Sequence, residues 1–218
     1  MNASANAETA YSFKGENDGS ASLNPTDNTA NIATVQGIIA DDKGRICLTV
    51  KADTNNNEEK RTYYLGALMI TPHLEIPGKI PVHINFTTSE KATQENLWNN
   101  VTSHLAGTKI ENLTDSEENT SGISLNITKS FAGITENGAS ETNTLFNMPA
   151  NVSSTGYWVN GVEKDGILAD NAEIVFSGLN PEKSYDFYMF GSYMNTTEVH
   201  EAEYSTFGTV ENYIGLNG

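Results

Sequence analysis

The sequence predicts an all-β protein, an antiparallel β-sandwich of the jelly-roll type with at most one short helix. Short segments in which apolar and polar residues alternate recur along the chain, and Gly, Pro and Asn turn signals separate them about every ten residues. Hydrophobic residues make up 37% of the chain and charged residues only 18%, so Asn, Thr, Ser and Gly supply most of its polar surface. With 218 residues the chain is long enough for one large β domain or two small ones.

The first strong strand patterns lie between residues 45 and 70. In RICLTVKA (45–52) apolar side chains alternate with Cys47 and two polar residues, so Cys47 is expected to be a strand residue rather than a reactive thiol. Because Cys47 is the only cysteine, an internal disulfide is excluded. The run YYLGALMI (63–70) is apolar almost throughout, which is typical of a central strand covered on both faces.

Three later segments, VHINF (82–86), GISLNIT (122–128) and SYDFYMF (184–190), predict half-buried strands, in which the alternate residues face outward or toward a second layer. The third follows a strand and a tight turn in AEIVFSGLNPEKSY (172–185), since Asn-Pro initiates turns. The predicted inward residues of the three strands are Val82, Ile84, Phe86, Ile123, Leu125, Ile127, Tyr185, Phe187 and Met189.

One helix and one linker are predicted. The helix falls within 89–105, where Leu97, Val101 and Leu105 recur every four residues. The linker is TPHLEIPGKIP (71–81), which holds three of the six prolines and a glycine, a composition that resists both helix and sheet ladder.

The two ends of the chain repeat one another. MNASANAETAYSFKG (1–15) aligns without a gap on MNTTEVHEAEYSTFG (194–208) when the chain is shifted by 193 positions, and matches continue to Asn24 on Asn217. A period of this size suits a whole domain and is too long for a solenoid unit. The candidate assembly residues are the paired matches Tyr11 with Tyr204 and Gly15 with Gly208. Two similar hairpin strands in one Asn- and Thr-rich protein are the alternative interpretation.

The repeat predicts a domain organisation that is out of phase with the chain. Residues 1–70 would be the C-terminal half of a sandwich unit, and 71–81 the linker. Residues 82–218 would be the N-terminal half of the next unit, in which the second copy (194–218) repeats the first copy (1–25). The two copies should then compete for one position, and the sandwich is either circularly permuted within the chain or completed between neighbouring chains.

Several phrases resemble a known family. The segments NFTT (85–88), WNN (98–100) and SGLNPEKSYDFYMFGS (177–192), followed from the chain start by VQGIIADDKGRICLTV (35–50) and YYLGALMI, resemble galactose-binding-like β-sandwich modules. Such modules occur in secreted, often repetitive surface proteins of Bacteroidetes and related bacteria. The resemblance covers nearly all of the chain once its halves are swapped in order. It implies a noncatalytic module for binding or spacing, although NFTTS departs from the family's usual Asn-Phe-Gly-Ser.

Charge and hydropathy limit the partners and the location. The net charge of −16 is spread over many loops, and such a surface repels nucleic acid and anionic lipid. No stretch approaches the roughly 20 apolar residues of a membrane span. We expect an extracellular or cell-surface protein, part of or cut from a longer exported precursor, that assembles with itself as a homo-oligomer or a head-to-tail polymer. Glycans are a second partner class, and membrane insertion is not expected.

Catalytic motifs are not found, and we expect neither an enzyme nor an organic cofactor. The sequence has no Gly-x-Ser-x-Gly elbow, no His-Glu-x-x-His and no phosphate-binding glycine loop. Calcium is the one metal ion left open, because it binds clustered oxygen ligands. Its candidate ligands are Asp41 and Asp42 in ADDKG and Asp115 and Glu117 in DSEEN, for which exposed acidic turns are the alternative.

Aromatic residues among polar neighbours are the candidates for sugar binding. They are Trp98 in LWNN, Tyr157 and Trp158 in STGYWVNG, and Tyr193 next to the start of the second copy. The same side chains could instead plug the ends of the sandwich, since Trp is highly buried on average. Two functions therefore stay open. The first is an extracellular structural repeat or filament subunit assembled by strand exchange, and the second is a carbohydrate-binding or adhesion module.

Overall fold

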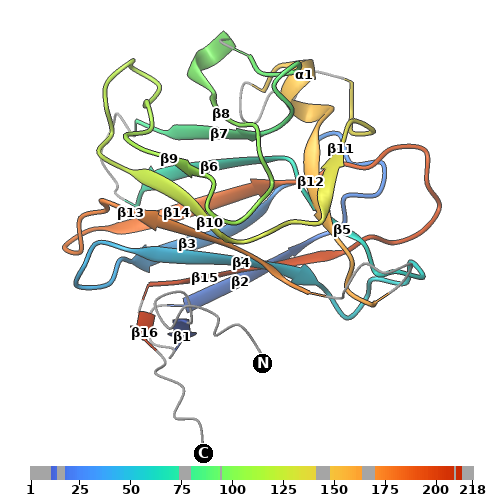
Figure 1. The fold of residues 1–218 in the computed structure, drawn as a ribbon, viewed down its shortest axis with the longest axis horizontal. Coiled ribbons are helices and arrows are strands. Elements are labelled where there is room, and N and C mark those ends of the chain that lie inside the picture. The colour runs from blue at the N-terminus through green and yellow to red at the C-terminus, as the bar shows by residue number, and fades with distance from the viewer. Residues whose placement is uncertain are drawn as a thin grey trace, which may run out of the picture.

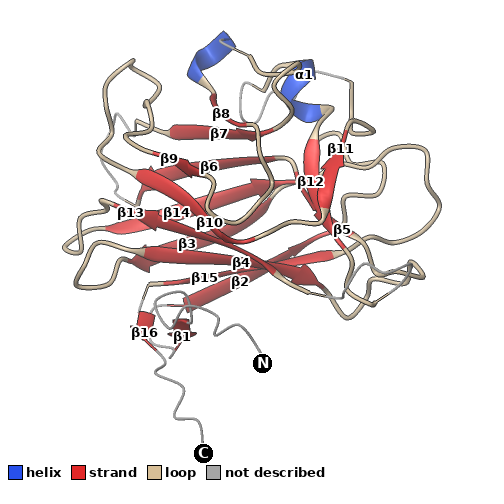
Figure 2. Cartoon of the chain, viewed as in Figure 1, coloured by secondary structure: helices blue, strands red, loops and turns tan. Residues whose placement is uncertain are grey.

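The computed structural model describes residues 11–13, 18–73, 80–93, 95–140, 148–163, 170–208 and 210–212. It confirms the predicted fold class, an all-β sandwich of antiparallel sheets with one short α-helix (Figures 1 and 2). Among the strands that the structure describes, every pair is antiparallel except β7 with β8, which is parallel.

Two large sheets form the sandwich. The first runs in the order β2 (Asp18–Leu23), β15 (Ala202–Phe207), β4 (Ile46–Ala52), β13 (Ala172–Ser177), β10 (Ser124–Lys129) and β9 (Lys109–Ile110). The second runs in the order β3 (Ala33–Ile39), β14 (Ser184–Phe190), β6 (Ala67–Pro72), β7 (Val82–Phe86) and β8 (Asn99–Val101).

Two smaller sheets and two short helices complete the described part of the chain. One sheet has the order β11 (Gly133–Thr135), β12 (Gly156–Val159) and β5 (Tyr63–Leu65), and the other pairs β1 (Tyr11–Phe13) with β16 (Val210–Asn212). The helices are the 3-10 helix η1 (Glu95–Leu97) and α1 (Ala150–Ser153). Among the described residues, no helix is both long and apolar enough to cross a membrane.

The core lies between the two large sheets. Phe176 of β13 and Phe187 of β14 meet across it with ring centroids 5.7 Å apart, and both side chains are fully buried. All nine residues predicted to face inward on the strands at 82–86, 122–128 and 184–190 are buried. The period of two in the sequence therefore identified the inner faces of β7, β10 and β14 correctly.

The apolar run at 63–70 is not one strand. It divides at Gly66 into β5, in the three-stranded sheet, and β6, which lies between β14 and β7. A Cβ on Gly66 would lie 2.8 Å from the carbonyl oxygen of Thr155, so the two backbones approach too closely for any side chain. An apolar run does not reveal such a corner, because both parts are buried.

The turn at Gly178–Pro181 carries the chain from one large sheet to the other. Gly178 has a φ of +79°, and a Cβ there would lie 2.1 Å from the carbonyl oxygen of Gly122. Leu179 is buried in the turn. The predicted strand, turn and strand at 172–190 are therefore present as β13 and β14, although the two strands do not pair with each other.

The predicted helix within 89–105 is wrong. The described residues of this region form the single turn of η1, which ends at Leu97 with a φ of +58°, and then β8. Val101 is buried as the β8 neighbour of Phe86, whereas Leu105 is 55% exposed. Residues 99–101 therefore form a strand that pairs with the edge of β7, although Leu97, Val101 and Leu105 have the spacing of a helix. The only α-helix in the described residues, α1, follows Pro149 and has no periodic signal.

Strands from both sides of the predicted linker alternate within the sheets. In the six-stranded sheet, β2 and β4 come from residues 1–70, and β15, β13, β10 and β9 come from 82–218. β6 and β7 are antiparallel neighbours with Ile70 opposite Val82. β6 includes the first two residues of the predicted linker, Thr71 and Pro72, which pair with β14, so the sheet extends into a segment predicted to resist it. Residues 74–79 lie outside the described residues. The division into halves of successive units stays a prediction.

Candidate functional site

The repeated ends of the chain meet at one edge of the six-stranded sheet. There β2, from the first copy, pairs with β15, from the second copy (Figure 1). Ala21 lies opposite Tyr204 in this pair. Figure 1 also shows β3 beside this edge, and β3 is itself the edge of the other large sheet. We call the position that β2 fills, beside β15 and over β3, the edge groove.

The alignment of the two copies shows which strands correspond to each other. At a shift of 193 positions, β15 corresponds to residues 9–14, which include β1, and β2 corresponds to residues 211–216. The edge groove thus combines the first strand of one copy with the second strand of the other. The remaining strands, β1 and β16, pair with each other in a separate two-stranded sheet.

Side-chain hydrogen bonds tie each strand of the edge groove to a neighbouring part of the fold. On the inner face Tyr204 is fully buried and its hydroxyl donates a hydrogen bond of 2.5 Å to the carbonyl oxygen of Tyr64. Burial raises the pKa of the Tyr204 phenol, so it stays neutral and a donor. On the outer face the Ser22 hydroxyl donates to the carboxylate of Asp53, and this bond is the main reason that the pKa of Asp53 is lowered.

The four candidate assembly residues lie in different surroundings. Tyr204 belongs to the core, and Gly208 is buried just after β15. Tyr11 belongs to β1, opposite Asn212 of β16. Gly15 lies outside the described residues.

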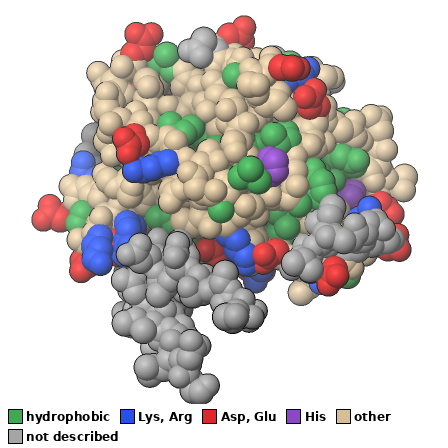
Figure 3. Space-filling model, in the orientation of Figure 1, with side chains coloured by type: hydrophobic (Ala, Val, Ile, Leu, Met, Phe, Trp, Pro, Cys, Tyr) green, Lys and Arg blue, Asp and Glu red, His purple; other side chains and the backbone are tan. Residues whose placement is uncertain are grey.

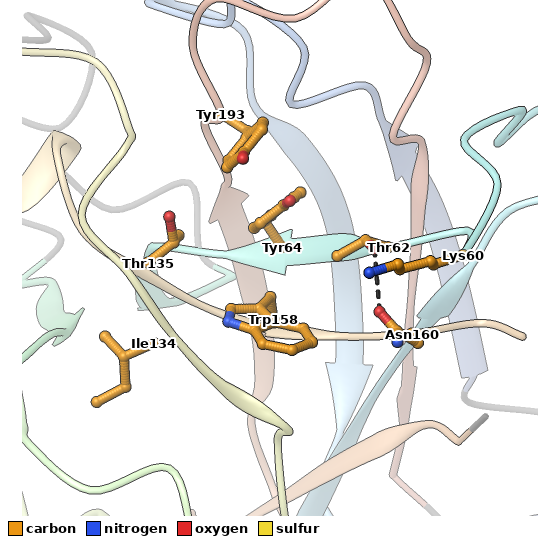
Figure 4. A pocket seen from close by; sticks show the side chains of 8 residues that line it. All are labelled: Lys60, Thr62, Tyr64, Ile134, Thr135, Trp158, Asn160 and Tyr193. Atoms are coloured by element: carbon orange, nitrogen blue, oxygen red, sulfur yellow. Dashed lines mark hydrogen bonds between the residues drawn. The ribbon is translucent and has the colours of Figure 1, made fainter. Parts of the chain in front are cut away.

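A second candidate is a hollow of about 290 Å³ on the outer face of the three-stranded sheet (Figure 4). We call it the aromatic hollow. It is lined by Lys60, Thr62, Tyr64, Ile134, Thr135, Trp158, Asn160 and Tyr193. Trp158 lies between Gly133 and Tyr64 across the three strands. A Cβ on Gly133 would lie 2.8 Å from Nε1 of Trp158, so the glycine lets the indole lie against the β11 backbone.

A buried amide at the aromatic hollow is only half satisfied. Oδ1 of Asn160 accepts a hydrogen bond of 3.0 Å from the hydroxyl of Thr62, as Figure 4 shows. Nδ2 of the same fully buried side chain has no acceptor within the described part of the chain. A buried donor without an acceptor costs free energy, and a ligand oxygen or a water molecule would supply the acceptor.

Stacked rings join the aromatic hollow to a second one. Tyr64 and Tyr193 stack with centroids 4.7 Å apart, and His200 meets both rings edge to face. The second hollow, of about 320 Å³, shares Lys60, Thr62, Tyr64 and Tyr193 with the first. Two carboxylates, Glu58 and Glu198, line it as well.

Of the four aromatic candidates from the sequence, two line the aromatic hollow and two are buried elsewhere. Trp158 and Tyr193 lie at the hollow. Tyr157 is fully buried, and its hydroxyl donates to the carbonyl oxygen of Val101 at 2.6 Å. Trp98 is 4% exposed and stacks on His83, whose pKa burial lowers, in a small cluster outside the main core.

Two of the four acidic candidates, Asp41 and Asp115, hold turns, and the other two, Asp42 and Glu117, are exposed. The Asp41 carboxylate accepts hydrogen bonds from the N–H groups of Lys43 and Arg45 and forms an ion pair of 2.7 Å with the Arg45 guanidinium, while Asp42 is exposed. Asp115 accepts hydrogen bonds from the N–H groups of Glu117 and Asn119. In the described residues, no three His, Cys, Asp or Glu side chains gather in a geometry that could hold a metal ion.

Charges are dispersed over the face that Figure 3 shows. Acidic and basic side chains occur singly or in small mixed groups, and uncharged polar side chains and backbone cover most of the remaining area. The thiol of Cys47 is fully buried in β4, and burial raises its pKa, so it is a poor nucleophile.

Sequence reasoning did not find Tyr64, Thr62, Asn160 and Lys60 as parts of a site. Tyr64 stands in the apolar run that Gly66 divides, and its position facing the hollow follows from that corner. Asn160 follows the predicted Tyr-Trp pair by two residues, and period-two alternation from Trp158 would have placed it on the same face.

Comparisons with protein-family models, with curated proteins and with solved structures found no match for this chain.

Proposed function

We propose that the chain is a noncatalytic structural subunit of an extracellular assembly, in which neighbouring copies are joined by exchange of the strand that fills the edge groove. The observation that carries this proposal is the origin of β2. It reaches β15 from the other end of the sequence, although an equivalent of β2 follows β15 directly at 211–216. Two segments of one chain thus correspond to one position.

The chemistry of an open sheet edge favours this function. Without β2, the outer row of N–H and C=O groups on β15 would lose its partners, and an unpaired edge recruits a strand from another chain. Leu23 of β2 is 6% exposed, so an exchanged strand would carry an apolar anchor as well as main-chain hydrogen bonds. A donor segment and an acceptor groove at different places on one subunit produce head-to-tail assemblies. The resemblance to modules of secreted repetitive proteins agrees with an extracellular location.

The test is the mass of the full chain in solution, measured by light scattering over a range of concentrations. We expect species heavier than the 23.6 kDa monomer that increase with concentration. The matched control is the double variant Ser20→Cys/Ser205→Cys, because these residues lie directly opposite each other on the outer face. A disulfide formed within the monomer would lock β2 in its own groove and block assembly, and reduction would restore it. A chain that stays monomeric at every concentration contradicts the proposal, as does a locked variant that still assembles.

A carbohydrate-binding or adhesion module is the second candidate function, and the aromatic hollow is the observation that favours it. Trp158 and Tyr193 both line it, as does a buried amide whose N–H groups lack an acceptor in the described residues. An aromatic face beside a few convergent polar groups suits a ring that has apolar C–H faces and hydroxyl edges, such as a sugar.

The second function is tested by calorimetry with neutral oligosaccharides. Trp158→Ala should weaken binding by about tenfold or more, because it removes the aromatic face. Tyr157→Phe is the control, since it deletes a buried hydrogen bond away from the hollow and should lower stability by about 1 kcal/mol without changing affinity. This function is contradicted if no neutral oligosaccharide binds, or if the Trp158→Ala variant binds as tightly as the unmodified chain.

A further inference from the structure

Two of the three residues on the inner face of β2 are the smallest amino acids. Gly19, Ala21 and Leu23 face the core in turn, and Val35 and Ile38 of β3 lie beneath the first of them. A Cβ on Gly19 would lie 2.4 Å from Cγ1 of Val35. That distance is shorter than real side chains tolerate.

The neighbours of Gly19 cannot easily give way. Val35 and Ile38 are 5% and 2% exposed and belong to the main core. Both are β-branched, so their χ1 angles are restricted, and Val35 is fixed further by its pairing with Phe187. A side chain at position 19 would therefore have to move β2 away from β3 or disturb the core.

The equivalent strand of the second copy is larger at two of these three positions. At a shift of 193 positions, Gly19 corresponds to Asn212, Ala21 to Ile214, and Leu23 to Leu216. In the register of β2, an Asn side chain would meet Val35. An Ile would replace the Ala that faces the fully buried Tyr204. Only the leucine anchor is shared.

We infer that the edge groove selects its strand by size: it accepts residues 18–23, from this chain or from a second copy, and rejects residues 211–216 although the repeat makes them equivalent. Gly19 is the main determinant and Ala21 the second. Under the proposed function, on which this step rests, the donor strand in an assembly is the N-terminal β2, and the acceptor is the groove between β15 and β3 of the neighbouring copy.

Cross-linking in the full chain identifies the strand in the groove. In the double variant Ser20→Cys/Ser205→Cys the new thiols face each other when β2 is bound. In the rival variant Ser205→Cys/Tyr213→Cys they would face each other only if 211–216 took the register of β2, because Tyr213 is the repeat equivalent of Ser20. We expect the first pair to form its disulfide about tenfold more readily, given the cost of overpacking a core. Equal or greater cross-linking of the rival pair would overturn the inference.

Exchanging the small and large residues tests the mechanism. Asn212→Gly/Ile214→Ala leaves β2 unchanged. Added to the rival variant, it should raise cross-linking between positions 205 and 213 several-fold. Gly19→Asn/Ala21→Ile should lower cross-linking between cysteines at positions 20 and 205. If this variant does not fold, Asn212→Gly/Ile214→Ala alone tests the mechanism. Unchanged cross-linking in the Asn212→Gly/Ile214→Ala variant would contradict selection by size.

The same cross-linking experiments, with products separated by mass on denaturing gels, distinguish this inference from the proposed function. Cross-links of the first pair that stay within one chain at every concentration would leave the selection intact and contradict assembly by exchange. Cross-links between position 213 of one chain and position 205 of another would agree with assembly by strand exchange. They would contradict the inference that the edge groove rejects residues 211–216.

Discussion

The repeated ends form two strand pairs that differ in what surrounds them. The pair β2 with β15 belongs to the six-stranded sheet, where β15 also pairs with β4. The pair β1 with β16 forms a sheet of two strands only. Each pair joins a first strand from one copy to a second strand from the other, so related sequences have been placed in two different environments.

The registers of the two pairs differ as well. Since Ala21 lies opposite Tyr204 and the copies are 193 positions apart, the repeat would place residue 214 opposite Tyr11. The structure instead has Asn212 opposite Tyr11, a shift of two residues. A shift of two keeps every side chain on its original face.

The difference indicates that the core, and not the repeated phrase, determines the pairing. In the edge groove the inner residues of β2 must fit Val35 and Ile38, which fixes both the identity of the strand and its register. A sheet of two strands has no such template, and pairs of this kind are marginally stable by themselves in water. The predictions below compare equivalent residues in the two copies.

The largest difference is expected for Tyr204→Ala compared with Tyr11→Ala. Tyr204 is fully buried and donates to the carbonyl oxygen of Tyr64, so its truncation should lower the free energy of unfolding by about 3–5 kcal/mol. Tyr11 is its repeat equivalent in the two-stranded sheet, where we expect a loss below about 0.5 kcal/mol. Urea unfolding of both variants measures the contrast. Similar losses for the two would show that β1 with β16 is as integral to the fold as β2 with β15.

The sandwich and its inner faces could be predicted because alternation with a period of two is a local property of each strand. The corner at Gly66 and the helix at 89–105 could not. In the first case a backbone contact with Thr155 breaks an apolar run, and in the second a strand edge competes with helical spacing.

The candidate site was predictable in part. Trp158 stood out as an aromatic among polar residues, and it does line the hollow. Trp98 has the same kind of neighbours, yet it covers His83 on the outer face of the five-stranded sheet. Local sequence does not say whether another segment will cover an aromatic ring. The repeat predicted competition for one position, but the size limit at Gly19 comes from Val35, which lies on a strand of the other large sheet.

A smaller difference is expected for Leu23→Ala compared with Leu216→Ala. Leu23 is 6% exposed at the end of an edge strand, so its truncation should cost about 2 kcal/mol. The corresponding position of the edge groove is already filled by Leu23, so Leu216→Ala should change stability by less than about 0.5 kcal/mol. Thermal or urea unfolding distinguishes the two variants. A greater loss from Leu216→Ala would mean that residues 211–216 compete effectively for the groove.

The smallest effect concerns a contact that only the first copy can make. Ser22 donates to Asp53, and its repeat equivalent is Gly215, which has no hydroxyl. Ser22→Ala should lower stability at neutral pH by about 0.5 kcal/mol, because the hydrogen bond is exposed to solvent.

The pH dependence of that small effect identifies its origin. The bond lowers the pKa of Asp53 in the folded chain from its ordinary value of 3.8, so the unfolded chain binds the proton more readily. The resulting stabilisation is present above pH 3.8 and is lost as the pH falls through the lower pKa of the folded state. Urea unfolding of the unmodified chain and of Ser22→Ala at a series of pH values should therefore show two curves that converge in acid. Curves that stay equally separated from neutral pH to below the folded pKa would mean that Ser22 stabilises β2 through some contact other than the Asp53 carboxylate.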